Sequence, residues 1–402
     1  MKYRIRPLVI FFTCLALCYP VATRAQANPL NEELFPLIPG LEKPVEFWKR
    51  IFAEFTLSQI VFFDSQDMSK IYEVLTVGEE SRSKDFITGE RTRIAVAHGV
   101  EVDRVRAQRG IKERMAAGLK RAGRYMPLIQ QAFGEKGLPA ELGYLPLVES
   151  SFDINARSHA GALGLWQFMR VTGKQYMRVE RHIDERRDPI TSTRAAALFL
   201  SQSYKLLGNW PLAITSYNYG PAGIARAVAQ MQTDNLVELI RDYKHPNWGF
   251  PPKNFYAEFL AAVEIAHNLD RYFPGLEIDA PLAVKEIELK NSTSLEALAK
   301  MKGLTEDQLL LWNPALTKQT RKVPAGYLVK IPVDARAEPI LEAASRSETK
   351  QPEVVRHRVK RGETVLQIAR RYGASVERIL ELNGIRRPHL VKVGTLLLIP
   401  KS

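Results

Sequence analysis

The sequence predicts a mainly α-helical protein, with a helical central domain followed by two small βααβ modules. Apolar residues recur at steps of three and four from Met115 to Phe133 and again from Phe255 to Leu269, which is the spacing of one helix face. The C-terminal part of the chain repeats one pattern of apolar, glycine and proline positions. At 402 residues the chain exceeds a single typical core, so more than one domain is expected.

The N-terminus has the pattern of a secretory signal peptide. A basic start is followed by the apolar run 8–18 and by Ala25-Gln26-Ala27, small residues that suit cleavage. Residues 1–27 are therefore predicted to be removed on export, and they contain both cysteines of the chain. Lipid attachment at Cys18 is the less favoured alternative, because Leu17 is bulky where a lipobox needs a small residue.

Residues 28–102 carry three compact apolar runs, at 47–52, 60–63 and 71–75. We interpret them as an accessory segment that packs on the helical domain 103–280. No motif in this segment indicates a function.

The domain 103–280 is expected to be predominantly helical. Pro127 should break or kink its first helix near Met126, because proline lacks an amide donor and clashes with the preceding turn. A second helix fits Thr193–Leu207, and Gly208 is placed to end it.

Two repeats, 281–333 and 354–402, follow this domain. Residues 334–353 join them, and this polar, proline-containing stretch is interpreted as a flexible linker. In the second repeat, residues 355–359 and 395–400 read as strands. The matching positions are Leu298, Ala299, Gly303, Asn313, Gly326 and Pro332 in the first repeat and Ile368, Ala369, Gly373, Asn383, Gly394 and Pro400 in the second. A capping box at Thr364-x-x-Gln367 should open a helix that Gly373 ends.

Glu149 is the strongest candidate for chemistry. It follows the apolar residues 145–148, and desolvation raises a carboxyl pKa toward neutrality, so that the group can donate a proton. The cluster 161–169 combines glycines and aromatic rings with the amide of Gln167, a mixture that suits a polar, ring-shaped ligand. Residues 213–220 add aromatic rings and an amide at an expected helix end.

Three ordered blocks, E-S-S-F from Glu149, G-x-x-G-L-W-Q-F-M from Gly161 and Y-N-Y-G from Tyr217, resemble the catalytic domain of the soluble-type lytic murein transglycosylases. The resemblance implies a lysozyme-like fold and cleavage of peptidoglycan glycan strands. It also implies that Glu149 acts first as acid and then as base, while the C6 hydroxyl of the muramyl sugar attacks and a 1,6-anhydro product forms.

The resemblance further implies substrate-binding roles for Ser158, Gln167, Met169, Tyr217 and Asn218. Other roles stay open: a turn for Ser158, core packing for Met169, and helix-end capping for the last two. Trp166 is interpreted as a core residue. Many relatives carry a second Glu in an E-T-x-x-Y block, whereas the matching stretch here is 251–255, P-P-K-N-F.

A mechanism with two carboxylates would need a second acid roughly 5 to 9.5 Å from the first. Asp153 is too near Glu149 in the chain to lie across a sugar from it. The other candidates surround two arginines and are expected to form salt bridges or helix caps; they are Asp184, Glu185 and Asp188.

The second repeat resembles a LysM module, a small binder of glycans that contain N-acetylglucosamine. The resemblance rests on R-G-E-T at 361–364 and N-G-I at 383–385, and it implies glycan contacts for Gly362, Glu363, Thr364, Asn383, Gly384 and Ile385. The first repeat is a degenerate match, because Ser292 and Thr293 stand where Gly362 and Glu363 do.

The sequence therefore predicts an exported peptidoglycan lytic transglycosylase in the periplasm of a Gram-negative bacterium, with peripheral envelope association as an open alternative. A muramidase that uses water and a non-catalytic cell-wall scaffold are the competing functions. The formal net charge is +13, of which residues 1–27 carry +4, leaving +9; this favours anionic partners, and export argues against nucleic acid. No metal or cofactor motif is recognised, so no cofactor is expected.

Overall fold

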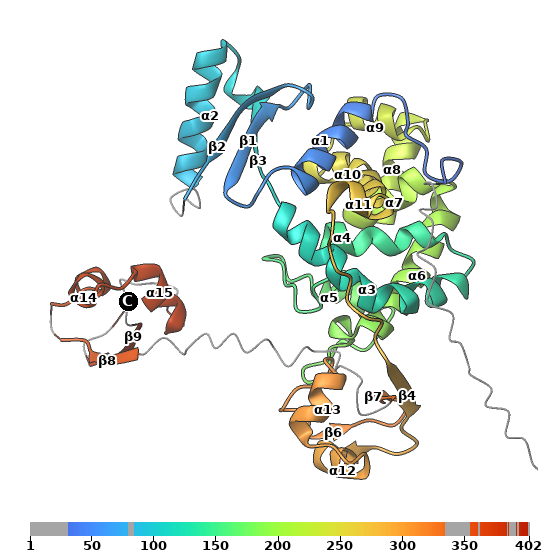
Figure 1. Ribbon diagram of the computed structural model, residues 1–402, viewed down its shortest axis with the longest axis vertical. Coiled ribbons are helices and arrows are strands. Elements are labelled where there is room, and N and C mark those ends of the chain that lie inside the picture. The colour runs from blue at the N-terminus through green and yellow to red at the C-terminus, as the bar shows by residue number, and fades with distance from the viewer. Residues whose placement is uncertain are drawn as a thin grey trace, which may run out of the picture. The chain divides into compact units, whose positions relative to one another are not determined.

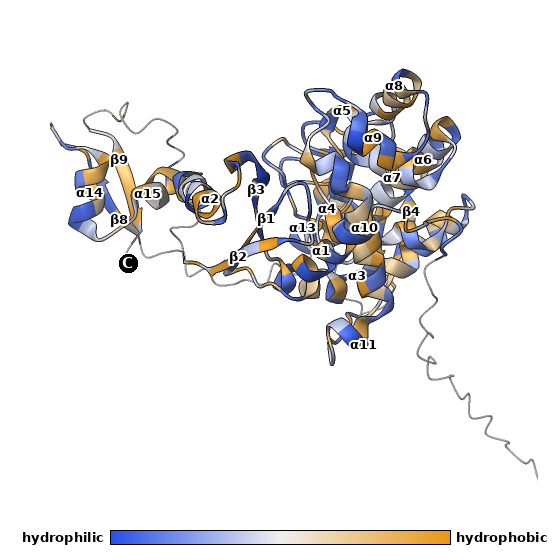
Figure 2. Ribbon diagram, turned by 90° about the horizontal axis from the view of Figure 1, so that it is seen from above, coloured by the Kyte–Doolittle hydropathy of each residue, from blue (hydrophilic) through white to orange (hydrophobic). Residues whose placement is uncertain are grey.

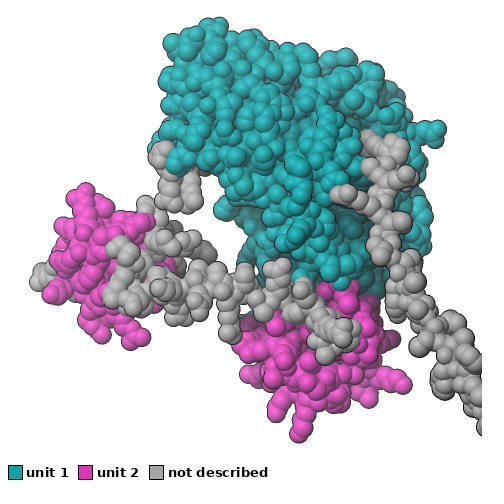
Figure 3. All heavy atoms as spheres, viewed as in Figure 1, with its two compact units in different colours: residues 1–281 teal, residues 282–402 magenta. Residues whose placement is uncertain are grey.

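The computed structural model describes residues 31–78, 84–333, 354–360, 362–383, 385, 391 and 394–400. The predicted signal peptide with Cys18, the linker 334–353 and Gly384 lie outside the described residues. The chain divides into two compact units between Pro281 and Leu282 (Figure 3). Helices dominate the first unit and small sheets accompany them (Figure 1), so the predicted mainly α class is confirmed.

The first unit is built around α10 (Phe250–His267), which packs against helices from both ends of the domain. Phe255, Phe259 and Leu260 are at most 3% exposed, because this helix is apolar on most of its surface and lies inside the unit. The surrounding helices are α3 (Lys112–Gly134), α4 (Leu145–Glu149), α5 (Arg170–Gly173), α6 (Pro189–Leu207), α7 (Trp210–Tyr219), α8 (Pro221–Met231), α9 (Leu236–Asp242) and α11 (Leu269–Tyr272), with 3-10 turns at Val102–Arg104, Ala140–Tyr144 and Glu185–Arg187.

The second predicted helix is present as α6 and begins earlier than expected. The Asp188 carboxylate accepts hydrogen bonds from the amides of Ile190 (3.1 Å) and Thr191 (2.8 Å) and so caps the helix. Pro189 suits the first helical position, where no amide donor is needed. Gly208, with φ of +81°, ends the helix as predicted.

The expected break at Pro127 does not occur. Helix α3 continues through the proline to Gly134. Beyond Pro127, Ile129 and Phe133 are at most 1% exposed. Burying two large apolar side chains stabilises this half of the helix by about 3–6 kcal/mol, enough to offset the roughly 3 kcal/mol that an interior proline costs.

A small antiparallel sheet precedes α3, with strands β1 (Gln59–Asp64), β2 (Ile71–Thr76) and β3 (Val105–Arg109) in the order β2-β1-β3. The helix α2 (Lys84–His98) packs on one face, where Ile60 and Phe62 meet Ile94. On the other face the ring centres of Phe63 and Phe47 lie 4.3 Å apart. Strand β1 is therefore covered on both faces, which explains its continuous apolar sequence.

The N-terminal segment also packs on the helices of the first unit. Helix α1 (Glu42–Ala53) lies against α10, and the indole of Trp48 donates a hydrogen bond to Asn254 Oδ1 (3.1 Å). The Tyr256 hydroxyl donates to the carbonyl of Pro36 (3.0 Å). Side chains of α10 are thus buried by residues that lie some 200 positions earlier in the chain.

Each C-terminal repeat has a βααβ order. The first contains β4 (Val284–Glu288), α12 (Leu295–Met301), α13 (Glu306–Trp312) and β7 (Leu328–Pro332), with the short strands β5 (Thr293–Ser294) and β6 (Lys322–Val323). The second contains β8 (Val354–Arg358), α14 (Val365–Tyr372), α15 (Val376–Leu382) and β9 (Leu396–Pro400). In both, the outer strands pair antiparallel in the same register, first residue with final proline.

Local signals explain the helix ends of the second repeat. The Thr364 hydroxyl accepts from the amide of Gln367 (3.2 Å), and the Gln367 side chain accepts from the amide of Thr364 (3.0 Å). The predicted capping box is therefore confirmed. Gly373 ends α14 with φ of +63°, and α14 places hydrophobic and hydrophilic residues on different sides (Figure 2).

One asparagine holds each repeat together in the same way. Asn313 Nδ2 donates to the carbonyl four residues earlier (2.9 Å) and to the carbonyl of Lys330 in the last strand of the first repeat (2.8 Å). Asn383 Nδ2 likewise donates to the carbonyl four residues earlier (2.7 Å) and to that of Leu398 in the last strand of the second repeat (2.7 Å). Oδ1 accepts from the amide of that same strand residue, at 2.8 Å in both. Both amide donors are thus used within the module, which favours a structural role for Asn383 over the predicted glycan contact.

Replacing Asn383 by Ala should lower the free energy of unfolding of the second repeat by about 2–3 kcal/mol, because backbone groups of α15 and β9 lose their partners. Amide hydrogen exchange of β9 measures this loss. Asn313→Ala is the matched variant and should destabilise only the first repeat. An Asn383→Ala chain that keeps the exchange protection of β9 but loses glycan binding would assign Asn383 to ligand contact instead.

No helix among the described residues combines the length and the apolar character needed to cross a bilayer.

Candidate active site

Glu149 is the last residue of α4, a short helix that packs between α3 and α10. Leu145 and Leu147 are at most 1% exposed and anchor this helix, while Glu149 is half-buried at its end. The apolar run before the acid therefore does what the sequence suggested: it docks the helix and leaves one carboxyl in a poorly solvated place.

The residues after Glu149 reverse the chain sharply. Ser151 and Phe152 have φ of +50° and +56°, a left-handed conformation that costs energy for residues other than glycine. Phe152 is fully buried and stacks on Tyr125 at 6.5 Å. Arg121 donates two hydrogen bonds to the carbonyl of Ser151 (3.1 and 2.6 Å). These contacts hold the strained turn and with it the position of the acid.

Two adjoining cavities bring the predicted site residues together. One of about 620 Å³ is lined by Glu149, Ser158 and Gln167. The other, of about 610 Å³, is lined by Gln167, Met169, Tyr217 and Asn218. Both volumes lie in the range of sites for sugar-sized ligands. Gln167 belongs to both linings, so the six residues named from the sequence border two neighbouring cavities.

Burial raises the pKa of Glu149 from its ordinary 4.5 to about 8, and the nearby charge of Glu258 adds to this effect. Burial also raises the pKa of Tyr217 well above its ordinary value, with a smaller effect from Glu149. Both groups therefore keep their protons at neutral pH. A carboxyl that is protonated there can serve as a general acid.

Glu258, on α10, is a residue that the sequence analysis missed. It is half-buried, and burial raises its pKa to about 8. The second acids considered from the sequence are Asp153, Asp184, Glu185 and Asp188. The stretch 251–255, where many relatives carry a second Glu, lies just before Glu258 on the same helix. The sequence feature that could have identified Glu258 is its position between the apolar residues Ala257 and Phe259, both of which are buried. A charged residue is unusual at such a position.

Replacing Glu258 by Gln should move the alkaline limb of the pH–rate profile to lower pH. The ionised Glu258 raises the pKa of Glu149; without that charge Glu149 loses its proton earlier as the pH rises, so activity near pH 8 falls while activity at acidic pH is kept. Glu264→Gln, on the same helix, is the control and should leave the profile in place. An unshifted Glu258→Gln profile would remove Glu258 from the site.

Ser158 and Gln167 shape the loop that faces the acid. Ser158 Oγ accepts from the amide of Ala162 (2.9 Å), so the serine closes a turn and also lines the cavity. Gln167 Nε2 donates to the carbonyls of Ala156 (3.0 Å) and Gly164 (2.8 Å). Gly164 is required here, since a Cβ at this position would lie 1.9 Å from a backbone oxygen.

The remaining predicted residues differ in exposure. Met169 is 43% exposed, so core packing does not explain it. Asn218 is also exposed. The Tyr217 hydroxyl donates to the carbonyl of Trp166 (2.8 Å) and ties α7 to the site loop. Trp166 is fully buried and donates to Thr193 Oγ1 (2.8 Å), which confirms its interpretation as a core residue.

The other acids considered from the sequence make structural contacts. Asp184 pairs with Arg186 at 2.7 Å, and the Glu185 carboxylate accepts from the amide of Arg178 at 2.7 Å. Asp188 caps α6, as described above, and Asp153 accepts from the amide of Asn155 (2.8 Å). Within the described part of the chain, no group of three His, Cys, Asp or Glu side chains is arranged to hold a metal ion.

In the second repeat, Glu363 joins three parts of the module. Its carboxylate accepts from the amide of Lys360 (2.8 Å) and from Arg371 (2.5 Å), and it pairs with His357 Nε2 (2.8 Å). The hydrogen bond from Lys360 and the contacts with His357 and Arg371 lower the pKa of Glu363 to about 2. Thr364 is used in the capping box, and Ile385 packs on the module core, whereas Gly362 is exposed with φ of +84°.

Comparison with known families assigns two of these regions. Residues 127–239 match the family model "Transglycosylase SLT domain", and residues 357–400 match "LysM domain". The chain contains a transglycosylase SLT domain and a LysM domain. The SLT match includes all six predicted residues of the cleft, and these two domains confirm the predicted resemblances and the predicted lysozyme-like fold class.

Two curated relatives are membrane-bound lytic murein transglycosylase D of Escherichia coli strains K12 and O6:H1, each 29% identical over 308 residues. That alignment covers 71% of this chain and 66% of the relative. A putative tributyltin chloride resistance protein of Alteromonas sp. is 36% identical over 114 residues, 28% of this chain and 55% of that protein.

Among solved structures, the 70 kDa soluble lytic transglycosylase of Escherichia coli is 19% identical, with a TM-score of 0.31, over 38% of this chain and 25% of that one. An inactive mutant of the lytic transglycosylase Slt of Pseudomonas aeruginosa is 21% identical, with a TM-score of 0.30, over the same shares.

Proposed function

We propose that the chain is an exported peptidoglycan lytic transglycosylase that cleaves the β-1,4 bond between N-acetylmuramic acid and N-acetylglucosamine. The observation that carries this proposal is Glu149, a half-buried carboxyl with a pKa raised to about 8 that lines a cavity of the SLT domain. The relatives named as lytic murein transglycosylases support the same substrate class.

The proposed reaction uses one carboxyl twice. Glu149 donates its proton to the bridging oxygen, the bond from that oxygen to C1 of the muramyl sugar breaks, and the N-acetyl group of that sugar stabilises the positive charge at C1. The Glu149 carboxylate then takes the proton of the C6 hydroxyl as O6 bonds to C1. The product is a 1,6-anhydro sugar, Glu149 regains its proton, and no water is consumed.

The surroundings of Glu149 favour both steps. Poor solvation makes the carboxylate that forms after the first step a strong base, which promotes the second proton transfer. Glu258 is not among the residues that line either cleft cavity. We therefore assign it an electrostatic role on Glu149 and no role as a nucleophile.

Digestion of purified murein followed by mass spectrometry of the products tests the reaction. Anhydromuropeptides are expected. Products with reducing ends, each heavier by one water, would identify a muramidase, and intact murein in the presence of bound protein would identify a cell-wall scaffold.

We also propose that both C-terminal repeats bind glycans that contain N-acetylglucosamine. The second repeat matches the LysM family, and the first has the same strand register and the same asparagine bonds. Binding modules joined to a catalytic domain raise the effective concentration of substrate. A chain that ends at residue 333 should therefore bind murein more weakly, and one that ends at 281 more weakly still.

The proposed location is the periplasm or cell envelope of a Gram-negative bacterium. A signal-peptide pattern in residues 1–27 and the name of the membrane-bound relatives support it. Fractionation of cells that express the full chain tests this, with recovery in the cytosol as the contradicting result.

A further inference from the structure

A third cavity, of about 490 Å³, lies where the loop after β1 approaches α9 and the first turn of α10. It shares no lining residue with the two cleft cavities. Its apolar lining includes Leu41, Met68 and Phe250, of which the first two are nearly buried. Its charged lining consists of three cations, Lys43, Arg241 and Lys253, and one carboxylate, Asp67.

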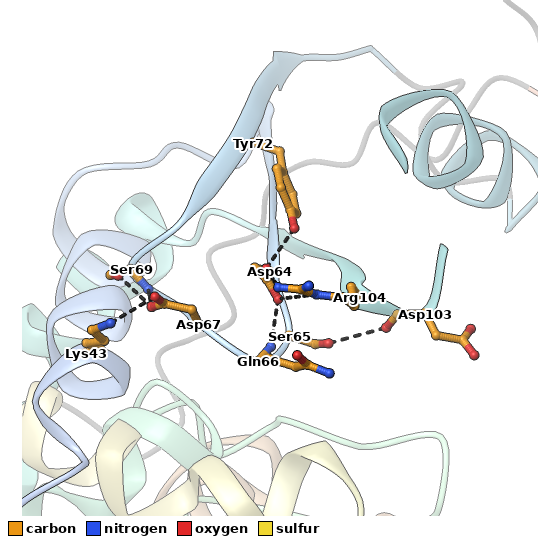
Figure 4. A network of polar contacts seen from close by, with 9 residues as sticks. All are labelled: Lys43, Asp64, Ser65, Gln66, Asp67, Ser69, Tyr72, Asp103 and Arg104. Atoms are coloured by element: carbon orange, nitrogen blue, oxygen red, sulfur yellow. Dashed lines mark hydrogen bonds and ion pairs between the residues drawn. The ribbon is translucent and has the colours of Figure 1, made fainter. Parts of the chain in front are cut away.

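The loop that forms one wall of this cavity is held by a polar network (Figure 4). Asp64 is fully buried and accepts from the amide of Gln66 (2.9 Å) and the hydroxyl of Tyr72 (2.8 Å), and it pairs with Arg104. Ser65 donates to the carbonyl of Asp103 (3.3 Å). The wall is therefore fixed by contacts within the protein before any ligand arrives.

Two of the three cations already have counterions. Lys43 Nζ lies 2.8 Å from Asp67 Oδ2, and Arg241 holds Asp242 through three contacts of 2.6 to 2.9 Å. Lys253 is half-buried, and no carboxylate of the described residues lies within ion-pair distance of its Nζ. Burial and, secondarily, the charge of Lys244 lower the pKa of Lys253.

The surroundings of Lys253 add positive potential. Lys253 lies in the first turn of α10, at the positive end of an 18-residue helix. The Arg106 guanidinium lies 4.2 Å from the ring centre of Phe250, the first residue of that helix. Burial of a cation beside other positive charges is unfavourable, and an anion bound in the cavity would offset that cost.

We propose that this cavity binds a peptide carboxylate that carries a small apolar side chain, as found in the peptide stems of the cell wall. Asp67 pairs with Lys43 and Asp242 pairs with Arg241, so among the described residues the ammonium of Lys253 is the one lining cation left to bind an anion. A single ammonium matches the single charge of a carboxylate better than the two charges of a phosphate monoester. The apolar lining accommodates an alanine-sized side chain. This inference rests on the proposed function, because it assigns the cavity to the peptide part of the same substrate.

Methyl NMR of the full chain with labelled methionines tests the site, since Met68 lines this cavity and Met169 lines the catalytic cleft. The probes are acetyl-Ala-Glu-Ala with free carboxylates and the neutral acetyl-Ala-Gln-Ala amide. We expect the acidic probe to shift the Met68 signal and not that of Met169, and to bind roughly tenfold more tightly than the neutral probe.

Lys253→Met should weaken binding of the acidic probe roughly tenfold. Lys244→Met removes the same charge from an exposed neighbour outside the lining and should change binding less than twofold. Equal effects of the two variants, equal binding of the two probes, or an unmoved Met68 signal would overturn the proposal. These outcomes are independent of glycan cleavage, so failure of the proposed function is detected separately, by the murein digest.

Discussion

Glu149→Gln should reduce cleavage of purified murein by about 10³-fold or more while murein binding is retained. Glutamine keeps the size of the side chain but cannot donate and recover a proton, and general acid–base catalysis contributes typically 10²- to 10⁴-fold per group. In the proposed mechanism the same carboxyl serves both steps, so both are lost. Product release from murein and a pull-down assay measure the two properties.

The stability of the Glu149→Gln variant serves as the control. The pKa of Glu149 is about 8 in the folded chain against an ordinary 4.5, so the folded state holds more protons between these values. The contribution of Glu149 to the free energy of unfolding is fully present below pH 4.5 and is lost as the pH rises through about 8. Glutamine does not ionise, so the variant should melt at or above the wild-type temperature at pH 8. A folded variant that still cleaves murein would refute the assignment of the acid.

Trp48→Ala should lower the free energy of unfolding of the first unit by about 3–5 kcal/mol, the usual cost of deleting a buried indole. Trp48 is 5% exposed and lies within ring-contact distance of Phe47, Phe52 and Phe250. Its loss also leaves the buried amide of Asn254 without the indole partner. Urea denaturation followed by circular dichroism measures the change.

Trp48→Phe separates packing from hydrogen bonding at this position. Phenylalanine keeps an aromatic ring but cannot donate to Asn254, so a loss of about 1–3 kcal/mol is expected. Hydrogen exchange of the α10 amides should increase in both variants, and more in Trp48→Ala. A change below about 1 kcal/mol in Trp48→Ala would mean that α1 does not stabilise the catalytic helices.

The cleft could be predicted to a large extent from the sequence, because its parts are short motifs with local physical causes. The apolar run before Glu149 docks α4, and the glycines of the 161–169 block permit a tight loop. Tyr217, in the last turn of α7, contacts that loop. The helix ends of the repeats could also be predicted, because a capping box and a left-handed glycine depend only on residues a few positions away in the chain.

Other features depended on contacts between distant segments. Pro127 reads as a helix breaker, yet burial of Ile129 and Phe133 keeps α3 continuous. The N-terminal segment has no clear period because β1 is covered on both faces. Met169 is exposed although Phe168 beside it is buried.

The sequence by itself determined the helical class, the tandem βααβ repeats and the choice of Glu149 as the candidate acid, because each follows from patterns confined to neighbouring residues. Only the tertiary structure decided that Glu258 acts on Glu149 and that Lys253 faces a third cavity. The physical reason is that desolvation and charge–charge effects depend on distance in space, and α4, α10 and the loop after β1 are far apart along the chain.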